Sequence, residues 1–417
     1  MRRSQLLAAT LAVAFLSGSL IAQENPPAAQ GGRGGGGGRG FGRGGVTIKD
    51  GEECPPGMTE VRPRSCAAPE FPPPSILDYR PRSTLRTDEH LKPRAKFPAI
   101  DYHAHISQFV GSQEGLAQLK VYMDSLNLGM MVEADNTSGA RLKTVLANIA
   151  ASPLKDRIRV LTGINFRGTG TPGWAAQAVK QLDDDIAAGA VGVGEIGKQF
   201  GLSTTKADGS RLRIDDPELD PVWDEAAKLG IPVFIHTAEP EEFFQPIDNH
   251  NERWLELSLF NDRRNGPGTG RPTFEELMTE RDNLFRKHPK TIFVAAHMGW
   301  HANNLPRLGK MFDEMPNVYT EMGAVLYDIG RQPRAAHDFF VKYQDRILFG
   351  KDSFQPEEYP YYWRVFETKD DYFDYYRPYH AFWKLYGINL PDDVLKKIYY
   401  RNALAITKKL PGAGFPR

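Results

Sequence analysis

Histidine and acidic side chains recur in this chain where short apolar segments end. Imidazole nitrogens and a carboxylate that meet at one point are the ligands preferred by a borderline divalent ion such as zinc. Such an ion with an open coordination position lowers the pKa of bound water to about 7 and so creates a nucleophile at neutral pH. The residues with this placement are His103, His105, Glu195, His236, His297 and Asp352.

His103 and His105 lie two residues apart at the end of the segment IDYHAH. Side chains alternate between the two faces of a strand, so a spacing of two directs both imidazoles to the same face. A single histidine in such a place is usually a hydrogen-bonded core residue. The ordered set, with His236 after PVFI, His297 after FVAA and Asp352 after ILFGK, instead predicts one metal site.

The elements that must position these residues begin at about residue 97. From there, short apolar runs alternate with longer amphipathic stretches, which is the pattern of a parallel α/β sheet. We expect helices at 116–126, 174–188, 221–229, 274–287 and 335–342, among others. We expect strands at 97–103, 129–134, 159–165, 190–195, 231–236, 291–297, 317–322 and 346–351.

Eight such units predict a (β/α)8 barrel, the TIM barrel, over residues 97–410. The active site of this fold lies at the C-terminal ends of the strands, where the histidines and acids stand. A doubly wound open sheet is the alternative. No glycine-rich fingerprint follows the first strand, which argues against the dinucleotide-binding form of that fold.

Composition narrows the class of protein. The 417 residues carry 52 Lys and Arg against 52 Asp and Glu, so the formal net charge is zero. This balance argues against a broadly basic nucleic-acid binder and favours a small-molecule substrate. No apolar run of about 18 residues occurs outside the extreme N-terminus, which excludes a multispanning membrane protein.

The N-terminal segment has the layout of a signal peptide. Two arginines precede the apolar stretch 6–16, and small residues follow at 17–19. Cleavage after residue 22 would leave an exported protein, periplasmic or secreted, without a membrane span. An uncleaved membrane anchor is the alternative.

Residues 23–96 do not resemble a catalytic domain. The Gly/Arg-rich segment 23–50 is predicted to be a flexible linker, with an Arg-Gly segment that binds nucleic acid as the alternative. Segment 51–96 is rich in proline and is expected to be extended. It holds the only cysteines, Cys54 and Cys66, which we expect to form a disulfide in an oxidising compartment, a two-cysteine metal site being the alternative.

The motifs DxHxH, IPVxIHT, AHMG and RILFGxD together resemble the amidohydrolase superfamily of metal-dependent hydrolases over about residues 97–410. The similarity is closest to the amidohydrolase-related (amidohydrolase 2) branch, which also contains aminocarboxymuconate-semialdehyde and resorcylate decarboxylases. The resemblance implies that His103, His105, His236 and Asp352 bind the ion and that Asp352 also shuttles protons. It implies that His297 orients or deprotonates the metal-activated water, or helps hold a second metal.

Two positions depart from the simplest pattern of the superfamily. Glu195 stands where many binuclear relatives carry a carboxylated lysine that bridges two metals. A glutamate can bridge too, as in the similar TatD-like nucleases, so the sequence predicts one zinc ion or two. The alternative for Glu195 is an ion pair with Lys198. Lys351 stands where Thr or Ser is more usual, and it either contacts an anionic substrate group or points to solvent.

Long insertions after the fourth, fifth and eighth strands, at 198–216, 239–272 and 353–380, are expected to shape the pocket. Lys198, Trp300 and Arg331 are the candidates for substrate binding. The third insertion is rich in aromatic residues. We expect it to pack on the barrel rim or at the interface of a homodimer, with a lid over a ring-shaped substrate as the alternative.

These observations predict an exported metal-dependent hydrolase. In this interpretation, activated water attacks the carbonyl of an amide, ester or lactone, and Asp352 or His297 moves the protons. The first alternative is a carboxy-lyase that uses the metal for non-oxidative decarboxylation of an unsaturated or aromatic acid. The second is a secreted binding module without metal, which the complete set of histidines and Asp352 argues against.

Overall fold

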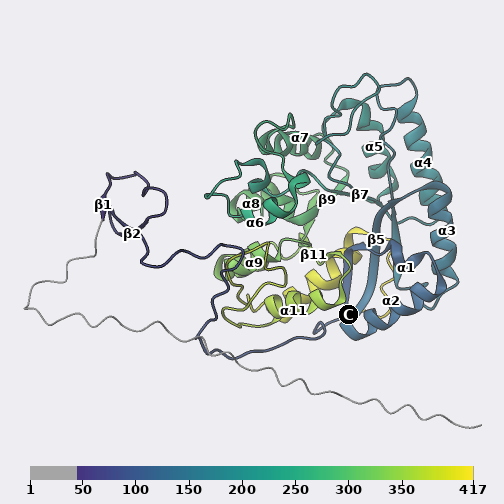
Figure 1. Cartoon of the computed structure of the whole chain (residues 1–417). Coiled ribbons are helices and arrows are strands. Elements are labelled where there is room, and N and C mark those ends of the chain that lie inside the picture. The colour runs from purple at the N-terminus through teal and green to yellow at the C-terminus, as the bar shows by residue number, and fades with distance from the viewer. Residues whose placement is uncertain (1–44, 417) are drawn as a thin grey trace, which may run out of the picture. The chain divides into compact units, whose positions relative to one another are not determined.

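The computed structural model describes residues 45–416, which separate into two compact units divided between Tyr79 and Arg80 (Figure 1). The predicted signal peptide 1–22 and most of the predicted linker 23–50 lie outside the described residues. Within the described residues, no helix is both long and apolar enough to cross a membrane.

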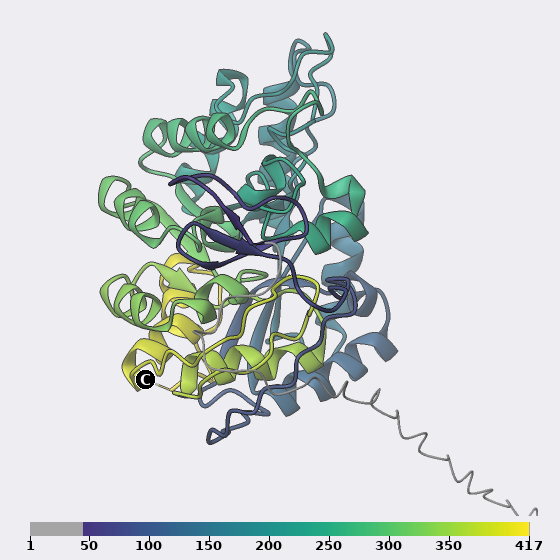
Figure 2. The ribbon, with the colours of Figure 1, turned by 60° about the vertical axis from the view of Figure 1, so that its left-hand side comes forward.

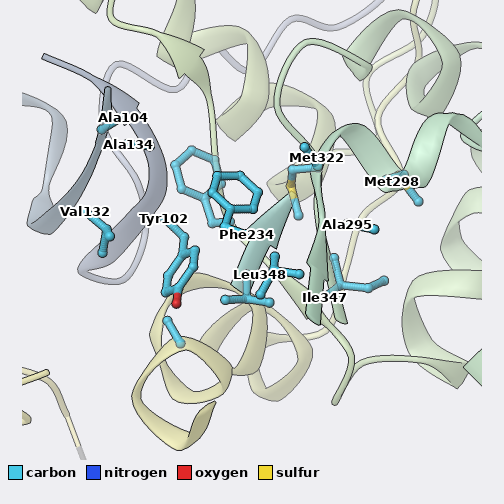
Figure 3. Close-up of a cluster of buried hydrophobic side chains, with 14 of the residues drawn as sticks. Tyr102, Ala104, Val132, Ala134, Phe234, Ala295, Met298, Met322, Ile347 and Leu348 are labelled. Atoms are coloured by element: carbon cyan, nitrogen blue, oxygen red, sulfur yellow. The ribbon is translucent and has the colours of Figure 1, made fainter. Parts of the chain in front are cut away.

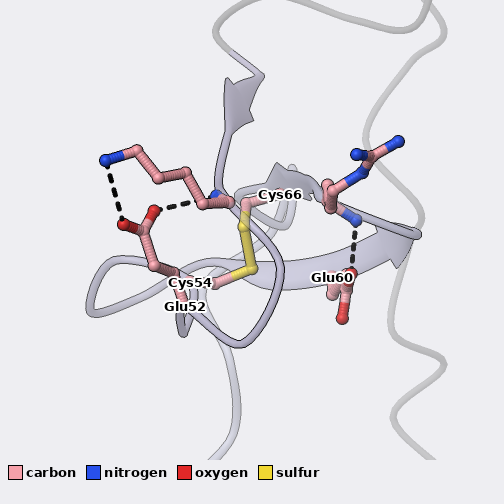
Figure 4. Close-up of a disulfide and its surroundings, with 6 residues drawn as sticks. Glu52, Cys54, Glu60 and Cys66 are labelled. Carbon is pink, nitrogen blue, oxygen red and sulfur yellow. Dashed lines mark hydrogen bonds and ion pairs between the residues drawn. A yellow bond between two sulfur atoms is a disulfide. The ribbon is translucent and has the colours of Figure 1, made fainter.

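The first unit is a small antiparallel sheet with the strand order β1-β3-β2. A disulfide joins Cys54 to Cys66, whose Cα atoms lie 5.7 Å apart, and the backbone nitrogen of Lys49 donates to Glu52 beside it (Figure 4). Such a bridge stabilises a piece too small for its own core by restricting the unfolded chain. The strands are β1 (Val46–Thr47), β2 (Thr59–Arg62) and β3 (Ser65–Ala67).

The second unit is built on a parallel sheet with the order β11-β10-β9-β8-β7-β6-β5-β4-β12. β11 pairs with β10 and β12 pairs with β4, and between them the backbone nitrogen of Tyr102 donates to the carbonyl of Phe349 at 2.9 Å. The sheet therefore closes on itself, which confirms the predicted TIM barrel. The strands are β4 (Ala99–His105), β5 (Leu128–Thr137), β6 (Ile158–Thr162), β7 (Val193–Ile196), β8 (Pro232–Ile235), β9 (Ile292–Ala295), β10 (Val318–Glu321), β11 (Ile347–Leu348) and β12 (Asp352–Ser353).

Helices surround the outside of the strands, with α2 to α5 along one flank of the barrel and α8, α9 and α11 along the opposite flank (Figures 1 and 2). Local sequence sets their ends: α7 begins with a capping box between Thr273 and Glu276, and α2 ends at Asn127 in the left-handed conformation. The α-helices are α1 (Ser107–Val110), α2 (Gln113–Leu126), α3 (Gly139–Ala150), α4 (Trp174–Ala188), α5 (Asp220–Leu229), α6 (Trp254–Leu259), α7 (Phe274–Lys287), α8 (Leu305–Glu314), α9 (Leu326–Arg331), α10 (Pro333–Lys342), α11 (Tyr359–Glu367), α12 (Asp392–Lys396) and α13 (Asn402–Ile406). The short 3-10 and π turns are η1 (Pro217–Leu219), η2 (Glu241–Phe244), η3 (Asn261–Arg263), η4 (Ala296–Trp300), η5 (Pro356–Glu358) and η6 (Lys397–Arg401).

The hydrophobic core of the second unit fixes the strands against one another and against the helices. The ring of Tyr102 meets Phe234 edge to face with centroids 6.0 Å apart, and its hydroxyl is 2.7 Å from Thr407 Oγ1 (Figure 3). Side chains from β5, β9 and β11 complete this cluster. Apolar residues fill the barrel interior and the interface between its strands and helices. The polar residues at the C-terminal ends of the strands therefore gather at one end of the barrel.

The eighth strand differs from the expected continuous segment 346–351, because residues 349–351 separate β11 from β12. Gly350 lies in this break, and a Cβ built there would be 2.4 Å from Glu321 Oε2 and 2.9 Å from the Cβ of His103. The break therefore lets the backbone pass close to two buried polar side chains. It also leaves Asp352 in a left-handed conformation, with φ of 81°.

The insertion at 353–380 forms η5 and α11, and several of its aromatic residues pack inward, whereas Tyr372 is exposed. Tyr359, Tyr362 and Trp363 are fully buried in the core. Phe349 of the eighth strand meets Trp363 at a centroid distance of 4.7 Å. These contacts fit the expectation of a segment packed on the barrel rim.

Candidate metal centre

Four imidazoles meet at the C-terminal ends of the strands. Nε2 of His103 lies 3.2 Å from Nε2 of His105, and both residues belong to the end of β4. Nε2 of His297 lies 3.2 Å from Nδ1 of His236, the residue that follows β8. The first and fifth strands and the turn after the sixth thus bring together the four histidines that the sequence singled out.

Glu195 of β7 lies between the two histidine pairs. Its Oε1 is 2.8 Å from Nδ1 of His236 and 3.4 Å from Nε2 of His103. Its Oε2 is 3.4 Å from Nε2 of His105. Because one carboxylate contacts both pairs, Glu195 belongs to two potential ligand groups, and His103, His297 and Glu321 form a third.

Asp352 completes the cluster from the eighth strand. Its Oδ1 is 3.4 Å from Nε2 of His105 and 3.9 Å from Nε2 of His103. Its side chain keeps about a quarter of its surface exposed, whereas Glu195 is buried. Asp352 is therefore the acidic group of the cluster that solvent or a substrate reaches most easily.

Acceptors behind the imidazoles fix the ring orientations. His103 Nδ1 is 3.1 Å from Glu321 Oε1, and His105 Nδ1 is 2.6 Å from Asp135 Oδ1. His297 Nδ1 is 2.8 Å from the carbonyl oxygen of Gly323. Each acceptor favours the tautomer whose proton is on Nδ1, which leaves a lone pair on Nε2 toward the centre, the usual arrangement around metal-binding histidines.

His297 stands in a strained turn. Residues 297–300 have φ between 53° and 58°, a left-handed run that only its glycine adopts without cost. The backbone nitrogen of His297 donates to Glu321 Oε1 at 2.7 Å, and the Trp300 ring lies 4.5 Å from the His297 ring. These contacts hold the imidazole over the cluster.

The electrostatics of the cluster call for a cation. Burial opposes ionisation of Glu195, yet its histidine neighbours, His103 foremost, hold its pKa well below the usual range. Burial likewise opposes the charged form of His105, but hydrogen bonds to Asp135 and Glu195 raise its pKa to about 10. Buried carboxylates here draw positive charge, and imidazole nitrogens facing one another at 3.2 Å suit a shared ion better than shared protons.

The donor set fits a divalent metal. Within each of three groups, imidazole nitrogens and carboxylate oxygens lie within 4.8 Å of one another, a donor set that suits such an ion. Nδ1 of His236 faces the cluster, whereas its Nε2 is buried without a hydrogen-bond partner among the described residues. The nearest acidic atom to that nitrogen is Glu239 Oε2, at 3.9 Å.

The candidates for substrate binding have different surroundings. Trp300 packs its ring against His297 and against His236, at centroid distances of 4.5 and 5.6 Å. Arg331 pairs with Glu252 and Asp328 and stacks on Trp383. These positions put Trp300 beside the cluster and tie Arg331 into an ionic network.

The structure changes the interpretation of two lysines, Lys198 and Lys351. Lys198 bonds to Glu239 at 2.7 Å, so the predicted alternative of a Glu195–Lys198 ion pair is wrong. Lys351 is buried and its ammonium bonds to Glu358 and to the carbonyl of Ser353, so it neither points to solvent nor is free for a substrate. Lys351 lies in the break between β11 and β12, and its side chain is directed into the rim of the barrel.

Sequence reasoning missed three acidic residues that support the site: Asp135, Glu239 and Glu321. Glu321 ends the seventh predicted strand, so the rule that selected Glu195 could have found it. Asp135 directly follows the second predicted strand and offers the same signal. Glu239 lies in an insertion, where no periodic pattern marks it.

The chain is similar to several solved structures at low sequence identity. No curated protein matches the chain. An uncharacterised TIM-barrel protein from Bordetella bronchiseptica is 16% identical, with a TM-score of 0.45, over 75% of this chain and 99% of that chain. A putative amidohydrolase from Staphylococcus aureus is 13% identical, with a TM-score of 0.46, over 74% of this chain and 99% of that chain.

A dihydroxybenzoic acid decarboxylase from Polaromonas sp. JS666, solved with bound manganese, is 14% identical, with a TM-score of 0.45, over 75% of this chain and 97% of that chain. The amidohydrolase family model matches residues 100–406, well over half of the sequence. That range contains every histidine and carboxylate of the cluster. The chain belongs to the amidohydrolase family.

Proposed function

We propose that the protein is an exported metal-dependent hydrolase of small molecules that acts on an amide, ester or lactone carbonyl. The observation that carries this proposal is the position of Glu195, whose two oxygens contact the His103/His105 pair and the His236/His297 pair. A carboxylate shared between two ligand groups favours a binuclear centre, and such centres suit hydrolysis. Export rests on the predicted signal peptide 1–22.

Two of the three potential ligand groups of the cluster share Glu195. His103, His105 and Glu195 form one, and Glu195, His236 and His297 form the other. Nitrogen and oxygen ligands in this proportion suit zinc, which we propose as the native ion, with two ions per chain. When bound, such ions polarise a carbonyl and acidify water.

Asp352 and His297 are the proposed proton carriers. Asp352 Oδ1 lies at the edge of the cluster and is the carboxylate most open to solvent, so it accepts a proton from the attacking water and returns it to the leaving group. His297 is held by Glu321 and by Gly323 and orients the reacting groups from the opposite histidine pair. Burial lowers the pKa of His297, which keeps its imidazole neutral.

The charges around the cluster favour hydrolysis over decarboxylation. A carboxy-lyase must hold the substrate's own carboxylate, which a nearby cation does best. Lys198, Arg331 and Lys351 are each paired with an acidic residue. A neutral carbonyl substrate therefore suits these surroundings better than an acid.

The test compares the two chemistries on one preparation of the full chain loaded with zinc. Hydrolysis of p-nitrophenyl esters, anilides and lactones is measured beside the release of carbon dioxide from hydroxybenzoic acids. We expect zinc-dependent hydrolysis, lost in His236→Ala and Asp352→Ala and kept in His250→Ala, a change of an exposed histidine outside the cluster. Carbon dioxide release without hydrolysis would overturn the proposal.

A further inference from the structure

The aromatic insertion at 353–380 contacts the barrel through polar atoms as well as through its rings. Glu358 ends η5, and Tyr359 and Tyr362 stand in the first turn of α11. Both tyrosines are 0% exposed, and each hydroxyl bonds to a residue of the barrel. These barrel residues lie in the segments that carry or orient the clustered side chains, so the insertion is connected to the histidine cluster.

Tyr359 is connected to the first and eighth strands through Asp101. The hydroxyl of Tyr359 donates to Asp101 Oδ2 at 2.5 Å. The other oxygen of this carboxylate accepts from the backbone nitrogens of His103 and Lys351, each at 3.1 Å. Asp101 is fully buried, so these donors fix the orientation of its carboxylate without help from solvent. Asp101 therefore joins the backbone of His103 to the segment that leads into Asp352.

Tyr362 supports the turn that orients His297. Its hydroxyl accepts a hydrogen bond from the backbone nitrogen of Ala324 at 3.1 Å. Ala324 has a φ of 56°, a left-handed conformation that a residue other than glycine keeps only where its surroundings hold it. The residue before it, Gly323, offers the carbonyl oxygen that lies 2.8 Å from Nδ1 of His297. The bond to Tyr362 therefore helps to hold the carbonyl that sets the ring orientation of His297.

A third contact fixes the insertion on both sides of Asp352. Glu358 bonds to the ammonium of Lys351, and Nε of Arg377 donates to the same carboxylate at 3.1 Å. The ammonium of Lys351 also donates to the carbonyl of Ser353 at 2.5 Å. The residues before and after Asp352 are thus held by one buried lysine that the insertion neutralises.

We propose that Tyr359 and Tyr362 are positioning residues of the metal centre, and that the aromatic insertion supports the clustered side chains from behind. Neither tyrosine belongs to a potential ligand group, so each acts through a barrel segment that carries or orients one. The inference rests on the metal centre of the proposed function. Loss of a group that orients a metal ligand weakens metal affinity by about 10- to 100-fold, which sets the size of the expected effect.

The test measures zinc affinity of the full chain by competition with a chromophoric chelator. Tyr359→Phe and Tyr362→Phe each remove one hydroxyl and keep the ring, and each should raise the zinc dissociation constant by about tenfold or more. Tyr399→Phe is the matched control, because Tyr399 is equally buried and its hydroxyl donates to Glu367 at 2.9 Å. It should leave the affinity unchanged. The visible spectrum of the cobalt-loaded chain, which reports ligand geometry, should change in the first two variants only.

Amide hydrogen exchange of the zinc-free full chain gives a readout that needs no metal. Tyr359→Phe should speed exchange in segments 101–105 and 349–353, and Tyr362→Phe in segment 321–325, because each loses a bond that holds the backbone there. Unchanged zinc affinity in either variant would overturn its assignment, and an equal loss in Tyr399→Phe would reduce both effects to general destabilisation. A parent chain that binds no zinc would refute the proposed function, and the positioning role would then stand or fall on the exchange rates.

Discussion

The Oε1 atom of Glu195 lies 2.8 Å from Nδ1 of His236, while its Oε2 faces Nε2 of His105 at 3.4 Å. This single side chain therefore connects histidines from the ends of the first and fifth strands. Because Glu195 is buried and contacts imidazoles on both sides, it does not form a surface ion pair. Its position makes the number of bound ions the first quantity to measure.

Glu195→Gln should reduce the zinc content from two ions per chain to one. The amide keeps the size of the side chain but loses the negative charge that two cations would share. Elemental analysis of the purified full chain measures the ratio. Glu241→Gln removes a carboxylate that bonds to Asn303 and belongs to none of the ligand groups, and it should keep both ions. Two ions in Glu195→Gln would rule out the bridging role.

Gly350→Ala should impair metal binding although residue 350 is no ligand. A Cβ at this position would lie 2.4 Å from Glu321 Oε2 and 2.9 Å from the Cβ of His103, so one of these buried groups must move. Displaced Glu321 no longer orients His103, and loss of such a supporting group weakens metal affinity by about 10- to 100-fold.

Gly197→Ala is the matched control for this glycine. It follows β7 close to Glu195, and a Cβ there meets nothing within 4 Å. Competition with a chromophoric zinc chelator measures both affinities. Equal affinities in the two variants would show that the close approach at Gly350 does not constrain the site.

Hydrophobic patterning was enough to predict the barrel and to find most of the histidines and acids that meet at its strand ends. Segments 174–188 and 274–287 form helices over the expected ranges, because apolar periodicity and end signals agree there. His236 and Asp352 were predicted to join the cluster because each follows a predicted strand, and parallel strands in a barrel end at one face. Local sequence therefore suffices where local and global preferences coincide.

Other features depend on tertiary contacts that no local pattern encodes. The break in the eighth strand arises because Gly350 passes against Glu321, a residue 29 positions away by number. The pairing of Lys198 with Glu239 rather than Glu195 depends on how an insertion folds. Lys351 is buried for the same reason, since Glu358 lies in the aromatic insertion.

Asp328→Asn should change the pH dependence of stability. Burial raises the pKa of Asp328 from its ordinary value of 3.8 to about 6, despite its pairing with Arg331. A carboxyl group whose folded-state pKa is raised stabilises the fold below pH 4, and that stability is lost as pH rises through 6. The asparagine variant should therefore gain up to about 3 kcal/mol relative to the parent between pH 4 and pH 7.

Urea denaturation at pH 4.5 and pH 7.5 measures this difference. Asp338→Asn provides the control, because that aspartate lies on α10 and is exposed. The difference in the free energy of unfolding between Asp338→Asn and the parent should be the same at both pH values. A constant offset for Asp328→Asn at both pH values would contradict the assignment of a raised pKa.

Truncation should separate the two units at residue 79 and not at residue 96. The segment before β4 is bonded to the barrel: the backbone nitrogen of His90 donates to Asp370 Oδ2 at 2.7 Å, and that of Lys96 donates to Glu367 Oε1 at 2.8 Å. Ala95 is buried and donates to the carbonyl of Leu126. These contacts are kept in a chain that starts at Arg80, which should retain the melting temperature and zinc content of the barrel.

A chain that starts at Phe97 loses these contacts. It should melt at least about 5 °C lower, because three backbone hydrogen bonds and one apolar contact disappear. Equal melting temperatures by calorimetry would show that residues 80–96 contribute nothing to the stability of the second unit.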